Sequence, residues 1–127
     1  MNLEKVVFYF FIVLAATLNF GFVYGDIDNP AHHDVWELFA AIVVNSIATV
    51  LKLGDRTQIG AVHLAVSLVA MLQLLAAAMV WFFATRNGSD ALSVSATISV
   101  VSLSVGAVFA NIVSVVLLVA ETVMMRR

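Results

Sequence analysis

The sequence predicts an all-α integral membrane protein whose four helices form one bundle, and three observations predict this class. The chain of 127 residues is 63% hydrophobic and only 11% charged, whereas a soluble domain carries roughly a quarter charged residues. Its apolar residues gather into four stretches, each near or above the roughly 20 residues with which a helix crosses a bilayer. Strands are excluded because four of them cannot close a barrel and open sheet edges are not tolerated in lipid.

The four stretches form a single transmembrane domain, residues 1–127, with helices expected at 6–24, 35–53, 59–84 and 92–124. The first stretch is interpreted as a membrane helix because its apolar run exceeds the roughly 7–15 residues of a signal-peptide core. The last two are longer than a bilayer requires and are expected to tilt or protrude. Short connections between antiparallel neighbours predict an up-down bundle.

Basic residues beside the helices predict the orientation of the chain. Cytoplasmic loops carry the excess of Lys and Arg, and only Arg86 lies on the side opposite to the other basic residues: Lys5, Lys52, Arg56, Arg126 and Arg127. Both termini are therefore expected in the cytoplasm, with the loops 25–34 and 85–91 on the outer side.

The helix expected at 35–53 carries a narrow stripe of polar and small residues. At about 100° per residue these positions fall within an arc of roughly 80°, and the residues are Asp34, Glu37, Ala41, Asn45, Ala48, Lys52 and Asp55. Such a stripe cannot face lipid, so it faces either water or other helices. In the first case several copies of the chain surround a pore lined by Glu37, Ala41, Asn45, Ala48 and Lys52, in which carboxylate rings select cations. In the second, Asn45 bonds across helices inside one bundle, and Glu37 and Lys52 reach opposite interfaces.

The loop before this helix is rich in possible ligands. Its carboxylates, amide and imidazoles are Asp26, Asp28, Asn29, His32, His33 and Asp34. The oxygen groups are of the kind calcium prefers and the histidine pair suits zinc, but the loop lacks the glycine and the final glutamate of an EF-hand. It is interpreted as an acidic outer vestibule that attracts cations, with a solvated turn as the alternative.

Isolated polar residues occur in every expected helix. The amides are expected to form hydrogen bonds between helices, and they are Asn19, Asn45, Gln73 and Asn111. His63, on one face with Ser67 and Ala70, is either a packed group or a proton relay. Glu121 is expected to pair with Arg126 or Lys52. Small residues of the last helix mark a helix–helix contact, within or between subunits, and they are Ser95, Ser99, Ser102, Gly106 and Ala110.

Several classes of function are excluded by what the sequence does not contain. There is no cysteine, so disulfides, thiolate metal sites and thiol catalysis are excluded. No basic patch is present to bind nucleic acid. No His-Glu-x-x-His pattern, phosphate loop or nucleophile with a neighbouring base occurs, so we do not expect an enzyme or a cofactor other than a divalent cation, such as calcium, at the loop.

The run from Gly25 to His33, followed later by Leu53-Gly54-Asp55-Arg56-Thr57-Gln58, resembles small four-helix inner-membrane proteins of bacteria that form a family of unknown function. The resemblance implies a bacterial inner-membrane location and no activity. The residues favour a homo-oligomeric cation channel, whose partners are lipid, inorganic cations and copies of itself. The alternatives are a non-conducting accessory or scaffold subunit and a small metal-ion or proton-coupled transporter that uses the loop histidines and His63.

Overall fold

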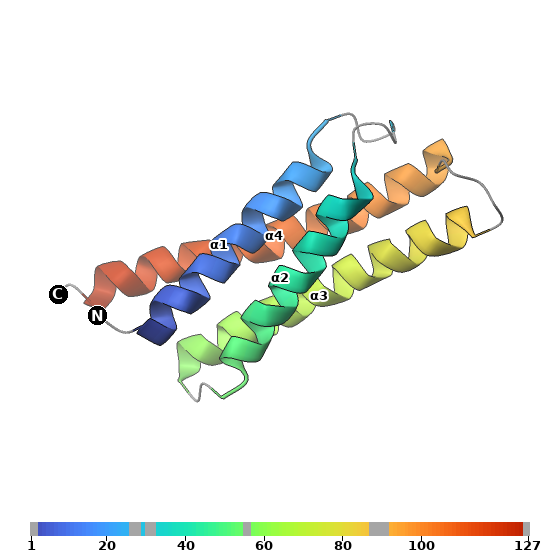
Figure 1. Cartoon of the computed structure of the whole chain (residues 1–127). Coiled ribbons are helices and arrows are strands. Elements are labelled where there is room, and N and C mark those ends of the chain that lie inside the picture. Colours follow the sequence, from blue (N-terminus) through green and yellow to red (C-terminus); the bar gives the residue numbers. More distant parts are fainter. Residues whose placement is uncertain (1–2, 26–28, 30–32, 55–56, 87–91, 126–127) are drawn as a thin grey trace.

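The computed structural model describes residues 3–25, 29, 33–54, 57–86 and 92–125, and it contains four α-helices (Figure 1). They are α1 (Leu3–Val23), α2 (Val35–Lys52), α3 (Gln58–Thr85) and α4 (Val94–Met125). The predicted helices are confirmed, with ends that differ by a few residues. All four are long and apolar enough to cross a membrane.

The starts of three helices are set by side chains that accept a backbone N–H. The Asp34 carboxylate accepts from the Trp36 N–H (3.0 Å), the Thr57 hydroxyl from Gly60 (3.0 Å) and the Ser93 hydroxyl from Ala96 (3.1 Å). Each bond satisfies a donor that the first turn of a helix leaves unpaired.

The helices run up and down in an antiparallel bundle, and each packs against its neighbour in the sequence, with α4 also against α1 (Figure 1). We call the end where α1 begins and α4 ends the proximal end, and the opposite end the distal end. In the orientation expected from the sequence, the proximal end is the cytoplasmic one.

The interior of the bundle contains two apolar clusters, while large apolar side chains cover its outside. One cluster consists of Phe22, Leu38, Ala41, Ala70, Leu74, Ala77, Val100, Ala107 and Ala110. A smaller one at the proximal end consists of Phe8, Ile12 and Ala48. Leu72 is 71% exposed and Phe109 65%. Exposed side chains of this size on every helix are what a lipid-facing surface requires, since lipid replaces water around them.

The small-residue stripe of α4 is used only in part within the chain. Ala110 is buried and Gly106 is half-buried against Gln73 of α3. The three serines nearer the distal end, Ser95, Ser99 and Ser102, are exposed.

Candidate functional site

The polar stripe of α2 lies inside the bundle of its own chain. Ala41, Asn45 and Ala48 are each 0% exposed, and Glu37 and Lys52 are half-buried at the two ends of the helix. Small side chains here allow the neighbouring helices to approach α2 closely. Of the two interpretations of the stripe, the geometry therefore favours contact with other helices. A pore between subunits lined by these three residues would require the bundle to open.

Glu37 extends into the bundle at its distal end, where a glycine of α1 makes space for it. A Cβ atom placed on Gly21 would lie 2.6 Å from Oε2 of Glu37. No side chain larger than hydrogen fits at position 21 without moving the carboxylate. The fold thus accommodates an ionisable group between α1 and α2.

Buried amides and hydroxyls lie deeper inside, and several have no hydrogen-bond partner among the described residues. The amide nitrogen of Asn45 donates to the Ala41 carbonyl of its own helix (2.8 Å), and the amide oxygen Oδ1 has no partner in the described part of the chain. Both polar atoms of Asn19 and of Asn111 are unpaired, as are the hydroxyls of Ser67 and Ser104. The hydrogen bonds between helices that we expected from these amides are thus not formed by Asn19, Asn45 or Asn111. An unpaired buried polar group costs about 1–3 kcal/mol, so these positions favour ordered water.

Contacts between α3 and α4 set which polar residues lie at the same depth. Gln73 reaches Gly106, where an added Cβ would lie 3.0 Å from its Cδ atom. Nearer the proximal end, Nδ1 of His63 and the Ser114 hydroxyl share a hydrogen bond of 3.3 Å. Because the helices are antiparallel with the same rise per residue, Ser67 lies level with Asn111, between these two contacts.

A similar contact fixes the depth of Asn45. The Ser46 hydroxyl of α2 donates to Sδ of Met71 in α3 (3.4 Å), which brings Asn45 to the level of Gln73. The interior thus carries polar residues at successive depths, from Glu37 at the distal end to His63 near the proximal end. We call the series Glu37, Asn19, Ser104, Asn45, Ser67, Asn111, Ser114 and His63 the polar file.

The proximal end of the polar file is covered by an aromatic ring. The Phe8 ring lies edge-on to His63, with 5.2 Å between the ring centroids, and the Lys52 ammonium lies 4.3 Å from the Phe8 centroid. His63 and Phe8 are both buried, at 1% and 2% exposure. The predicted face of His63, Ser67 and Ala70 is confirmed as a buried face of α3.

Glu121 of α4 is held by α1 at the same end. The Tyr9 hydroxyl donates to its Oε1 (2.8 Å), and the Lys5 ammonium lies 3.9 Å from its Oε2. We expected Glu121 to pair with Arg126 or Lys52. The ion pair that the structure shows is with Lys5 instead, and Arg126 lies outside the described residues.

The predicted outer vestibule is described only in part, since Asp26, Asp28 and His32 lie outside the described residues. Asn29 is half-buried. His33 is buried, and its Nδ1–H donates to the Phe22 carbonyl (2.6 Å) at the end of α1. Asp34 is exposed and caps α2. Among the described residues, no three His, Asp or Glu side chains are grouped closely enough to hold a metal ion.

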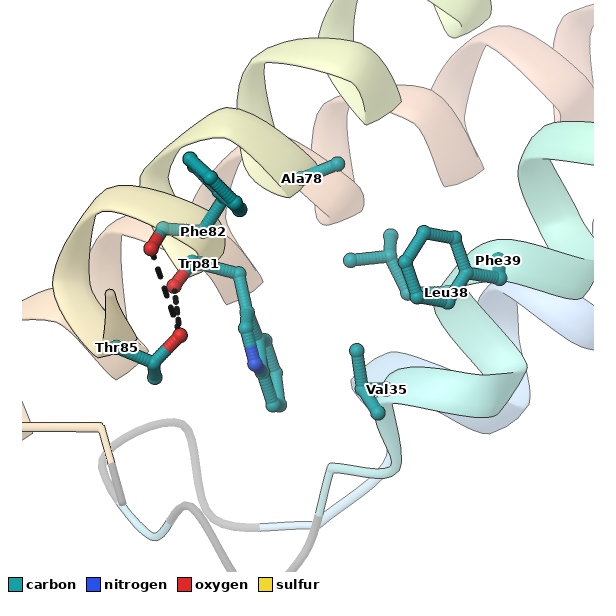
Figure 2. Close-up of a pocket in the computed structure, with 7 residues that line it drawn as sticks. All are labelled: Val35, Leu38, Phe39, Ala78, Trp81, Phe82 and Thr85. Atoms are coloured by element: carbon teal, nitrogen blue, oxygen red, sulfur yellow. Dashed lines mark hydrogen bonds between the residues drawn. The ribbon is translucent and has the colours of Figure 1, made fainter. Parts of the chain in front are cut away.

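A separate apolar groove lies between α2 and α3 at the distal end (Figure 2). It has a volume of about 220 Å³ and is lined by Val35, Leu38, Phe39, Ala78, Trp81, Phe82 and Thr85. The Thr85 hydroxyl donates to carbonyls of its own helix at Trp81 (2.9 Å) and Phe82 (3.5 Å). The Thr85 hydroxyl is thus used within its own helix, and the other side chains that line the groove are mostly apolar.

Five residues of the site were not predicted from the sequence: Phe8, Tyr9, Gly21, Ser104 and Ser114. The two serines lie outside the stripe of small residues that was expected on the last helix. Phe8 and Tyr9 stand among other aromatic and aliphatic residues of α1, where nothing distinguishes them from lipid-facing side chains. Gly21 carried a weak signal, since glycine in an apolar helix allows a close approach.

Comparison with known proteins gives a family and no activity. No curated protein and no solved structure matches the chain. A model of a family of unknown function, DUF6394, matches residues 32–122, a range that covers α2, α3 and most of α4. The chain therefore belongs to the DUF6394 family, whose function is unknown.

Proposed function

We propose that the protein conducts small cations, protons above all, across the membrane through the polar file inside each chain. The observation that carries the proposal is that all four helices place polar side chains in the bundle interior, between the carboxylate of Glu37 and the imidazole of His63. Polar and ionisable residues are costly in a membrane and mark ion pathways or proton relays when they face the bundle interior. This proposal keeps the expected cation transport but moves its path from an axis between subunits into the subunit.

Protons fit this interior better than larger cations do. Side chains such as Leu74, Ala77 and Val100 are 0% exposed and fill the space between the polar levels. A metal ion needs a continuous ring of oxygen ligands to replace its hydration shell. A proton needs only hydrogen-bonded groups and a few waters, and the unpaired buried atoms of Asn19, Ser67 and Asn111 can bind such waters.

The sequence predicts the orientation of the protein and the membrane in which it lies. The basic residues favour a cytoplasmic proximal end, and the resemblance to small bacterial inner-membrane proteins implies that membrane. As expected from the sequence, the acidic residues Asp26, Asp28 and Asp34 supply an outer vestibule that concentrates cations; Asp26 and Asp28 lie outside the described residues. The exposed serines of α4, Ser95, Ser99 and Ser102, suit contact with a second copy of the chain, so that a homo-oligomer contains one path in each subunit.

Proton flux into vesicles that contain the purified protein tests the proposal. A potassium diffusion potential drives uptake, and an internal pH-sensitive dye reports it. Glu37→Gln, which removes the ionisable group at nearly constant size, is expected to lower the flux about tenfold or more. Glu4→Gln is the matched control, since it makes the same chemical change at an exposed residue in the first turn of α1, outside the polar file; its flux should equal that of the wild type.

Two results would contradict the proposal. If vesicles with the wild-type protein take up protons no faster than protein-free vesicles, the chain does not conduct, and a non-conducting accessory subunit becomes the better interpretation. If Glu37→Gln and Glu4→Gln conduct equally, the path does not pass Glu37.

A further inference from the structure

Lys52 and His63 both contact the Phe8 ring at the proximal end of the polar file. Phe8 contributes from α1, Lys52 from the end of α2 and His63 from the first turns of α3, so three helices meet at one aromatic ring. The Lys52 ammonium is 4.3 Å from the ring centroid and the His63 ring centroid is 5.2 Å from it, with an interplanar angle of 72°. An ammonium this close to an aromatic face is held by cation–π attraction.

We propose that Phe8, with Lys52 held against it, is the selectivity barrier that keeps metal cations out of the proximal end while protons pass through His63. This inference rests on the proposed proton path and adds to it the residue that determines specificity. Two physical effects act on an ion that must pass the ring itself. The buried apolar ring blocks a hydrated ion as a hydrophobic constriction does, and the adjacent positive charge repels any cation that approaches the ring.

A proton has a way around the ring that a metal ion lacks. His63 shares a hydrogen bond with Ser114 of α4, on a helix different from that of Phe8. Glu121 follows Ser114 by seven residues, on the same face of α4 and about 10 Å nearer the proximal end. Its carboxylate is hydrogen-bonded by Tyr9 and lies beside Lys5. Leu118 lies between Ser114 and Glu121 and packs against the cluster of Phe8, so in this proposal the proton crosses that distance through bridging waters. Among the described residues, the same groups form no cage for a metal ion.

The competing explanation is that Phe8 only fills the core. It belongs to a cluster with Ile12 and Ala48, and any large residue there contributes packing. Ile12 is the matched control, because it is 0% exposed in the same helix and cluster but cannot hold an ammonium by a π face. Truncating either residue opens a cavity, and only Phe8→Ala also removes the barrier.

The experiment measures proton and potassium fluxes separately in vesicles with wild-type protein, Phe8→Ala and Ile12→Ala. The wild type should pass protons and retain potassium. Phe8→Ala should raise potassium flux about tenfold while proton flux persists, and Ile12→Ala should retain potassium. Phe8→Leu keeps most of the volume without the aromatic face, and Lys52→Gln removes the charge with little loss of side-chain length. Both should raise potassium flux by a smaller factor, on the order of threefold to tenfold, and both test the barrier should Phe8→Ala fail to fold.

Each result decides between the explanations. If all Phe8 and Lys52 variants that conduct protons also retain potassium, Phe8 is not the selectivity barrier. The proposed proton path is unaffected by that result. An equal potassium leak through Ile12→Ala and Phe8→Ala assigns the effect to loosened packing and also overturns the barrier. Absence of proton flux in the wild type overturns the proposed function itself, and the barrier with it.

Discussion

The distal and proximal halves of the bundle are built on different principles. The distal half is closed by apolar side chains such as Leu38, Leu74 and Val100, which are fully buried against one another. In the proximal half the apolar cluster is small, and it is surrounded by an ion pair, a buried imidazole and an ammonium on an aromatic ring. Both halves lie in the same four helices, so the difference comes from side chains and not from backbone architecture.

The difference between the two halves suggests that packing and ionisable groups are concentrated at different ends of the bundle. In a membrane, helices associate through close packing, because lipid chains are as apolar as leucine and provide no hydrophobic drive between helices. The distal half has the close packing and should hold the bundle together. In the proposed proton path, the proximal half contributes the imidazole of His63 and the carboxylate of Glu121, and this half would determine which ions pass. Glu37 is an exception among the helix residues of the distal half, since it is an ionisable group that lies where Gly21 leaves space.

The largest effect on stability is expected from Leu74→Ala, in the middle of the distal cluster. When the helices separate, they remain in an apolar environment, so the free energy of transferring the leucine side chain largely cancels. The cost of the cavity remains and should lower the free energy of unfolding by about 2 kcal/mol. Equilibrium unfolding in mixed detergent–SDS micelles, followed by circular dichroism, measures this loss. Proton flux through the variant should be close to that of the wild type.

The control for this variant is Leu72→Ala, two residues away on the lipid-facing side of α3 and 71% exposed. It should change the free energy of unfolding by less than about 0.5 kcal/mol. If both variants lose the same stability, the distal cluster is not what holds the bundle together, and the contrast between the two halves fails.

Most of the fold could be predicted from the sequence, because lipid imposes it. The four apolar runs require helices, since no other open structure satisfies backbone groups in a bilayer, and short connections require antiparallel neighbours. The ends of α2 and α3 were within a residue of the prediction. The start of α4 was less well predicted, since Ser93 caps this helix and no apolar pattern marks that position.

The candidate site was predicted less completely, for a physical reason. The periodicity of α2 shows that Ala41, Asn45 and Ala48 avoid lipid, but a helix packed in its own chain and a helix facing a shared axis have the same periodicity. Only the positions of the other helices distinguish the two cases. Phe8 could not be predicted at all, because its role depends on Lys52 and His63, which contact it from two other helices.

A smaller effect on stability is expected from Gly21→Ala, which tests how Glu37 is placed in the distal half. The new methyl group would lie 2.6 Å from the Glu37 carboxylate, so the carboxylate must leave its place between α1 and α2. Because the atom met is the far end of a flexible side chain, the shift should cost at most about 1 kcal/mol. A hydrophobic carbodiimide, which modifies carboxyl groups in membranes, should label Glu37 at a changed rate, measured by peptide mass spectrometry.

Gly54→Ala is the control for Gly21→Ala, because an added Cβ there meets nothing within 4 Å. Equal labelling of the two variants would show that Gly21 does not position Glu37.

The smallest effect is expected from Tyr9→Phe, which removes one hydrogen bond of the proximal half. The variant loses the 2.8 Å bond to Glu121, and hydrogen bonds between membrane helices contribute about 0.6 kcal/mol on average. The same unfolding measurement applies, with Tyr24→Phe as control, since Tyr24 is 71% exposed. Lys5 still faces the Glu121 carboxylate in the variant, which limits the cost of the unpaired oxygen. A loss larger than that of Leu74→Ala would reverse the comparison: polar contacts at the proximal end, and not apolar packing at the distal end, would then hold the four helices together.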